Sequence, residues 1–187
     1  MCENKMKVPV FLSYPKPHQK AQNQFIQKLK KKLKNLGLEP MTLGDSDYDM
    51  EAPLVGIRRL MNQSCGLINV SFKRSKIHSG TFKCDADINN NDAQPIKDIW
   101  LSSPYSQIEP AMAFQLGLPV LIIREKDVLA DGVLEKGVLG IYMPEVDLSK
   151  DMKEYFKSKE WQQLINQWAG KVRQVWETNG HPAKKFT

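Results

Sequence analysis

The sequence predicts an α/β protein built on a doubly wound, mostly parallel sheet of five strands. Short apolar runs bounded by turn residues alternate with longer stretches whose apolar residues recur at helical spacing. Because each predicted strand is followed by a helical segment, neighbouring strands should run parallel, with helices covering both faces of the sheet. Right-handed crossovers then give the strand order 2-1-3-4-5.

The predicted strands are the most apolar segments of the chain. They cover residues 8–14, 38–43, 65–71, 119–123 and 138–143. The fourth run contains no charged residue, which is typical of a strand in the centre of a parallel sheet. The predicted helices cover residues 19–36, a segment beginning at Pro53, residues 103 or 106 to 116, a short segment at 128–135 and a long closing helix at 152–177.

Two of these helices carry surfaces that have an alternative interpretation. In the first, apolar residues line one face, so the lysines of residues 28–34 are expected to be a solvated face rather than a nucleic-acid site. In the closing helix, Trp161, Trp168 and Trp176 fall on one apolar stripe, and we expect this stripe to pack on the sheet.

Residues 72–100 interrupt the alternation with a polar stretch that has no clear period. It is too long for an ordinary connection in a compact domain, so we expect either a disordered segment or an inserted functional loop that is mobile or forms a lid over the site. The chain is long enough for one good core. We therefore predict a single domain over residues 1–187, with a core at 7–147, the insert at 72–100 and a helical extension at 150–178.

Composition argues against several classes of protein. Three cysteines, Cys2, Cys65 and Cys84, form no close pair, and the three histidines have no metal-ligand spacing, so neither a disulfide framework nor a metal site is expected. Much of the net charge of +6 belongs to the lysine-rich helix, which leaves no separate nucleic-acid footprint. No apolar run is long enough to span a bilayer and the N-terminus is polar, so we expect a soluble, cytoplasmic protein with no membrane partner.

The candidate site follows from the predicted sheet. In an open parallel sheet, ligands bind at the carboxyl ends of the strands. Ser13 and Tyr14, Asp45, and Ser71 follow three of these ends, and residues 102–110 should bring Glu109 to the same edge. Each of the strand-end residues is also explained by ordinary turn chemistry.

Glu109 itself has two interpretations that the residues alone leave open. Residues 106–109 match the S-x-x-E capping box, in which the glutamate only bonds the backbone of the cap residue. Alternatively, Glu109 is a catalytic carboxylate facing the cleft. Pro110 lacks an N–H and suits only the first turn of a helix, so either interpretation places Glu109 at the helix start.

Three segments together resemble Toll/interleukin-1 receptor (TIR) domains. Residues 10–14, with the sequence VFLSY, followed by a charged helix, are similar to the first conserved box of that family. Residues 57–71 resemble the segment around its third strand. Tyr105, with Glu109 four residues later, resembles its W-x-x-x-E motif, whose glutamate is catalytic in TIR enzymes that cleave NAD. The resemblance spans residues 7–147 and implies a flavodoxin-like fold with Glu109 as the catalytic residue.

The sequence departs from that family in two places, and it also resembles another. Position 105 is a tyrosine where the family has tryptophan, and Tyr105 still offers a flat aromatic face on which substrate can stack. The 72–100 insert is longer than in most members of the family. Residues 109–120 are also similar to a segment of nucleoside 2-deoxyribosyltransferases, whose glutamate attacks the anomeric carbon. Those enzymes have a Gly-Pro turn after the first strand, where this chain has Ser13-Tyr14-Pro15.

The TIR resemblance implies an NAD glycohydrolase or ADP-ribosyl cyclase that uses NAD as a substrate and needs no cofactor. It further implies a nucleotide signal in antiphage defence, a separate nucleotide-activated effector and self-association through TIR contacts. Ser13 and Tyr14 would line the base or diphosphate pocket, Asp45 would approach a ribose hydroxyl, and Ser71 and Tyr105 would contact substrate. The two alternatives are a deoxyribosyltransferase-like enzyme and a non-enzymatic TIR interaction module in which Glu109 only caps its helix.

Overall fold

The computed structural model describes residues 7–43, 52–142 and 144–178. Its main sheet has five strands in the order β2-β1-β3-β6-β7, and every neighbouring pair is parallel. These strands are β1 (Val8–Ser13), β2 (Leu38–Met41), β3 (Leu67–Ser71), β6 (Val120–Arg124) and β7 (Ile141–Tyr142). The predicted strand order is confirmed, and it is that of the flavodoxin-like fold.

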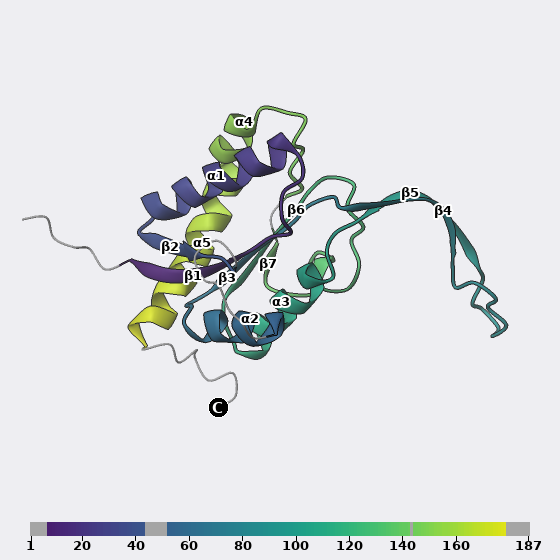
Figure 1. Ribbon diagram of the computed structural model, residues 1–187, viewed down its shortest axis with the longest axis horizontal. Coiled ribbons are helices and arrows are strands. Elements are labelled where there is room, and N and C mark those ends of the chain that lie inside the picture. The colour runs from purple at the N-terminus through teal and green to yellow at the C-terminus, as the bar shows by residue number, and fades with distance from the viewer. Residues whose placement is uncertain (1–6, 44–51, 143, 179–187) are drawn as a thin grey trace, which may run out of the picture.

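Helices cover both faces of this sheet, as Figure 1 shows. On one face lie α1 (Lys20–Asn35), α4 (Met152–Lys157) and α5 (Lys159–Glu177); on the other lie α2 (Pro53–Asn62) and α3 (Tyr105–Gln115). The apolar stripe of α1, from Phe25 to Leu33, is buried in the core, so the lysines of this helix form its outer face as expected. None of the helices formed by the described residues combines the length and the apolarity that crossing a bilayer requires.

The closing helix packs on the sheet, but it is not continuous. Trp161 and Trp168 are buried and Trp176 is half-exposed, so two of the three indoles dock as predicted. The chain breaks at Ser158, whose hydroxyl accepts a hydrogen bond from the Trp161 N–H at 3.1 Å and so caps α5. The break lets Phe156 in α4 stack on Phe25 of α1, with ring centroids 5.2 Å apart.

Close approach of α5 to the sheet depends on Gly66, just before β3. A Cβ atom at this position would lie 2.6 Å from Cγ2 of Val172 and 3.3 Å from the Trp168 ring. The Trp168 indole N–H donates to the carbonyl of Pro119 at 3.1 Å, which fixes the helix beside the start of β6. A larger residue at position 66 would push the helix off the sheet.

The expected loop at 72–100 is instead a β-hairpin, and its predicted lid role over the chain's own site is wrong. Strands β4 (Ser75–Phe82) and β5 (Gln94–Leu101) form a separate antiparallel sheet. Figure 1 shows this hairpin projecting away from the main sheet. No clear period marks this segment because neither strand has a fully buried face and most of their side chains are exposed.

Two smaller expectations also differ from the structure. The predicted helix at 128–135 is reduced to one 3-10 turn, η1 (Gly132–Leu134). The predicted last strand at 138–143 is shortened to β7, and residue 143 lies outside the described residues. β7 is the edge strand of the sheet, and the 3-10 turn packs against α3 instead of the sheet.

Candidate active site

A cavity of about 550 Å³ opens at the carboxyl ends of β1, β2 and β3. This is the edge at which an open parallel sheet binds its ligands, and the volume is that of an ordinary small-molecule site. Its lining includes Ser13, Tyr14, Tyr105 and Glu109, four of the six residues predicted from sequence. Ser71 is fully buried and is absent from the lining of the cavity, and Asp45 lies outside the described residues.

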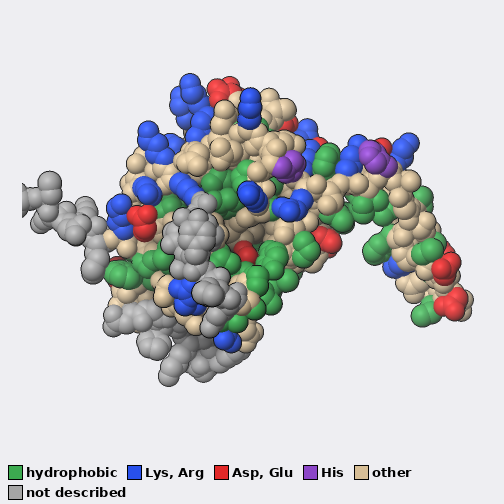
Figure 2. All heavy atoms as spheres, in the orientation of Figure 1, with side chains coloured by type: hydrophobic (Ala, Val, Ile, Leu, Met, Phe, Trp, Pro, Cys, Tyr) green, Lys and Arg blue, Asp and Glu red, His purple; other side chains and the backbone are tan. Residues whose placement is uncertain are grey.

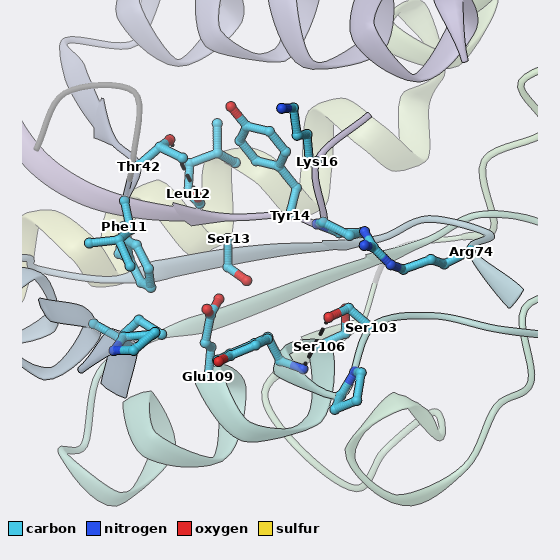
Figure 3. A pocket seen from close by; sticks show the side chains of 16 residues that line it. Phe11, Leu12, Ser13, Tyr14, Lys16, Thr42, Arg74, Ser103, Ser106 and Glu109 are labelled. Carbon is cyan, nitrogen blue, oxygen red and sulfur yellow. Dashed lines mark hydrogen bonds between the residues drawn. The ribbon is translucent and has the colours of Figure 1, made fainter. Parts of the chain in front are cut away.

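Glu109 lies on the side of α3 that packs against the sheet. The buried residues of this helix are Ser106, Glu109, Pro110 and Ala113, at the spacing of an apolar stripe. The Glu109 side chain is therefore only 8 % exposed, at the base of the cavity. Figure 3 shows its carboxylate directed toward the Ser13 hydroxyl at the end of β1.

The surroundings of Glu109 oppose its ionisation. Burial raises the pKa of Glu109 to about 7, and a hydrogen bond from Ser13 lowers it only in part. No positively charged group contributes to this balance. A carboxylate in an apolar cleft with a pKa near neutrality is typical of a reactive group rather than of a structural ion pair.

The structure is incompatible with the capping-box interpretation of Glu109. Helix α3 begins at Tyr105, and its N-cap residue is Pro104, which makes no side-chain cap hydrogen bond; the Tyr105 N–H donates instead to the Ser103 hydroxyl at 3.3 Å. Ser106 is thus inside the helix, where its hydroxyl shares a hydrogen bond of 3.0 Å with the Ser102 hydroxyl. Because Ser106 is not the cap residue, Glu109 has no capping box to complete.

Pro110 lies in the interior of α3, beyond the first turn to which sequence reasoning assigned it. A proline at this position has no N–H to offer the carbonyl of Ser106, one turn earlier. That carbonyl instead accepts a hydrogen bond of 3.4 Å from the side-chain amide of Asn69 in β3. The proline therefore frees a backbone group through which the central strand holds the start of the helix.

Asn69 is a residue of the site that sequence reasoning missed. It is fully buried, its Oδ1 accepts from the Ser13 hydroxyl at 3.0 Å, and its Nδ2 donates to the Ser71 hydroxyl at 2.8 Å. One side chain thus links the end of β1, the end of β3 and the first turn of α3. An amide among the apolar residues of a central strand was the signal available in the sequence, since buried polar groups are retained where they have partners.

Two cations at the cavity, Lys16 and Arg74, were also missed. They follow β1 and β3 and line the cavity. Figure 3 shows the Arg74 side chain extending toward the space between Ser13 and Ser106, and the Lys16 side chain lying beside Tyr14 and pointing away from Glu109. Both are exposed, and no carboxylate of the described residues forms an ion pair with either. The cavity thus combines a buried carboxyl at its base, aromatic and hydroxyl groups on its walls and positive charge at its mouth.

No group of histidine, cysteine, aspartate or glutamate residues suited to a metal ion occurs in the described part of the chain. Cys65 is buried, and desolvation raises the pKa of its thiol, which makes it a poor nucleophile. Among the described residues that line the cavity, Glu109 is the one carboxyl group.

Comparisons with known proteins place the chain among distant structural relatives only. No protein-family model matches the sequence, and no curated protein matches it. The solved structures similar to it include a CMP N-glycosidase of Clostridium botulinum, with a TM-score of 0.48 and 11% identity over 79% of this chain and 96% of that chain. They also include the TIR domains of the Roq1 resistosome, with a TM-score of 0.40 and 12% identity over 96% of this chain and 90% of that chain.

A diflavin flavoprotein of Nostoc is similar at the same level, with a TM-score of 0.46 and 15% identity over 91% of this chain and 97% of that chain. These proteins carry out different functions on similar strand arrangements, and likeness this distant carries no information about chemistry. The function of the chain is therefore indicated by the residues of its own cavity.

Proposed function

We propose that this chain is an enzyme that cleaves the N-glycosidic bond between nicotinamide and ribose in NAD, with Glu109 as the catalytic carboxylate. The observation that carries the proposal is Glu109 at the base of the cavity, nearly buried, with a pKa of about 7 and no cation to neutralise it. Such a group stabilises a positive charge that develops against it. Departure of a base from a sugar creates that charge on the ribose ring.

The reaction balances without a metal or a proton donor. The C1′–N bond breaks with its electron pair moving to the nicotinamide nitrogen, so a cationic ring leaves as a neutral base. The ribose ring acquires an oxocarbenium-like charge, which the ionised Glu109 carboxylate stabilises. Water, or a nucleophile of the same nucleotide, then forms the new bond at C1′, and water loses its proton to solvent. Hydrolysis gives ADP-ribose, and attack within the molecule gives a cyclic isomer.

Charge at the mouth of the cavity favours NAD over a deoxynucleoside. Lys16 and Arg74 are the cationic residues of the lining, and a diphosphate is the part of NAD that they would bind. A plain deoxynucleoside offers them no partner, which weighs against the deoxyribosyltransferase alternative. Tyr14 and Tyr105 provide the aromatic surfaces against which a base or a ribose would pack.

The product and its use are a further part of the proposal. The ADP-ribose or cyclic product would be a diffusible signal in antiphage defence that activates a separate effector protein. This part rests on the TIR resemblance of residues 10–14 and of the Tyr105-Glu109 motif. Identifying the product by mass spectrometry and adding it to candidate effectors tests it separately from the cleavage reaction.

The substrate assignment is tested by incubating the protein with NAD, nicotinamide riboside and deoxynucleosides and separating the products. We expect nicotinamide release from NAD. Arg74→Met should raise KM for NAD by about tenfold or more, since hydrogen bonds to charged groups are worth about 1.5–3 kcal/mol. It should leave cleavage of nicotinamide riboside, which has no phosphate, nearly unchanged.

Lys31→Met is the matched control because Lys31 is an exposed cation of α1 outside the cavity lining. It should behave as wild type with both substrates. Base release from deoxynucleosides but not from NAD would replace the proposal by the deoxyribosyltransferase alternative. Release from no substrate, in protein shown to be folded and at high concentration, would favour a non-enzymatic module.

A further inference from the structure

The β4–β5 hairpin, which we call the arm (residues 75–101), has no packing partner along most of its length. Its two strands pack chiefly on each other, and most side chains on both faces are exposed. Figure 2 shows the arm standing clear of the body of the protein. An isolated two-stranded sheet is marginally stable in water, so an arm of this kind requires a surface to cover it.

The base of the arm is fixed to the body. Trp100 packs against the core and lies below the ammonium groups of Lys73 and Lys76, at 5.6 and 5.9 Å from the ring centroid. Its carbonyl accepts a hydrogen bond of 2.8 Å from the Leu129 N–H, and the Leu101 carbonyl accepts one of 2.9 Å from the Arg74 N–H. The arm is thus held in one direction, away from its own cavity, and is presented to another molecule.

The tip of the arm (residues 82–93) is both apolar and acidic. Phe82 and Ile88 are 57% and 71% exposed, the second being the most exposed large apolar residue of the described chain. The tip carries three carboxylates, from Asp85, Asp87 and Asp92, against the single amine of Lys83. In a chain with a net charge of +6, this is an acidic patch on a basic protein.

A complementary surface lies on the body of the same chain, at the start of α1 and near the base of the arm. A groove of about 760 Å³ runs beside the start of α1 and the ends of β1 and β2. Among the described residues, its lining includes Lys16, His18 and Lys20 but no acidic residue. Tyr14, Pro17 and Leu43 give it apolar surface. It shares Tyr14, Lys16, Thr42 and Leu43 with the cavity that contains Glu109, so the two openings are continuous.

We propose that the occupant of this groove is the arm tip of a second copy of the chain. The apolar side chains of the tip can pack on the apolar surface of the groove, and the negative charge of the tip complements the lysines of the groove. Since each copy has one arm and one groove, a two-fold dimer would bury two such contacts. If the chain has the proposed function, a docked tip would also cover the neighbour's cavity at Tyr14 and Lys16 and help to exclude water from it.

Cys84 provides a direct test because it is an exposed thiol at the tip, whereas Cys65 is buried. With Cys2 replaced by Ser, Cys84 is labelled with a photoreactive maleimide and the full-length protein is irradiated. We expect crosslinks between two chains that join Cys84 to the segment from Tyr14 to Gln27. Crosslinks elsewhere on a second chain, or within one chain only, would overturn the proposal.

The oligomeric state gives an independent readout by sedimentation. Phe82→Ser with Ile88→Ser should weaken the dimer by at least tenfold, and so should His18→Glu with Lys20→Glu, since both sets remove the proposed complementarity. Mixing His18→Glu/Lys20→Glu protein with Asp85→Lys/Asp87→Lys protein should restore association through the exchanged charges. Val138→Ser, at an exposed apolar residue before β7, is the control that should change nothing.

A wild-type protein that remains monomeric up to about 100 μM, where a micromolar contact is populated, would overturn the proposal. So would a dimer that is unaffected by either set of variants. These readouts do not require catalysis, so they separate the dimer from the reaction. An active monomer would contradict the dimer alone, and an inactive dimer would contradict the proposed reaction alone.

Discussion

At the scale of single residues, Glu109 occupies a position that helix packing normally gives to an apolar side chain. It falls on the buried stripe of α3, between Ser106 and Ala113. A carboxyl group at such a position lowers the stability of the fold when it is ionised and unpaired. Its pKa of about 7 reflects burial, which raises the pKa, and the hydrogen bond from Ser13, which lowers it. Residues that cost stability at such positions are expected where function requires them.

The proposed reaction requires the ionised form of Glu109, so activity should follow its titration. We predict that kcat/KM for NAD rises about tenfold per pH unit below pH 7 and levels off above it, because the pKa of free Glu109 is about 7. Nicotinamide release measured between pH 5 and 9 tests this. Activity that falls as pH rises through 7 would instead make the protonated carboxyl the active form.

The same titration predicts how stability depends on pH. The pKa of Glu109 is raised from 4.5 to about 7 on folding. Below pH 4.5 the group is protonated in both states and has no effect. Between these values the unfolded chain loses its proton more readily than the folded protein does, so stability falls as pH rises. The loss is complete above pH 7 and amounts to at most about 3 kcal/mol.

Glu109→Gln removes that pH-dependent loss because glutamine does not ionise. We predict that the variant melts at the same temperature as wild type near pH 4.5 and several degrees higher at pH 8, at roughly 2–4 °C per kcal/mol for a chain of this size. Thermal melts at the two pH values provide the comparison. If the melting temperatures of wild type and Glu109→Gln differed by the same amount at both pH values, burial would not raise the pKa of Glu109.

At the scale of elements, Asn69 connects β3 with β1 and α3, and it also competes with Glu109 for one hydrogen. The Ser13 hydroxyl has a single proton, and Asn69 Oδ1, at 3.0 Å, competes for it with the Glu109 carboxylate, whose pKa the hydrogen bond from Ser13 lowers. Asn69 therefore acts as a positioning residue. Its side chain sets both the start of α3 and the proton affinity of the group that α3 carries.

Substitution of Asn69 should move the pH–rate midpoint in opposite directions. Asn69→Leu frees the Ser13 hydroxyl for Glu109 and should lower the midpoint, whereas Asn69→Asp adds a negative charge beneath Glu109 and should raise it. Both variants should lose about 1–3 kcal/mol of stability through unpaired buried groups, as melts would show. Midpoints equal to that of wild type would reduce Asn69 to a purely structural residue.

At the scale of the whole molecule, the strand order could be predicted because apolar runs and helical periods alternate along the chain. The long-range pairing of β3 with β6 then follows from the handedness of crossovers. The arm could not be predicted in this way because its strands bury no apolar face, so no pattern of period two marks them. The break at Ser158 was missed because the stripe of apolar residues continues across it.

The site was only partly predictable for related reasons. Glu109 and Ser13 were found because strand ends and a motif mark them. Ser71 was predicted to contact substrate because it ends a strand, but a strand end alone does not reveal which side chains point into the core. In the structure, the Ser71 side chain is fully buried. Lys16 and Arg74 look like ordinary solvated cations in the sequence, and only the fold brings them to one opening.

The most direct test of the central claim compares nicotinamide release from NAD by wild type and by Glu109→Gln. We predict that the variant loses about 10²–10³ in kcat, the usual effect of removing one preorganised electrostatic group, while it folds and melts at least as well as wild type. The assay is run at pH 8, where Glu109 is ionised, and at protein concentrations that span any dimer. Equal activity of the two proteins would contradict the assignment of Glu109 as the catalytic carboxylate.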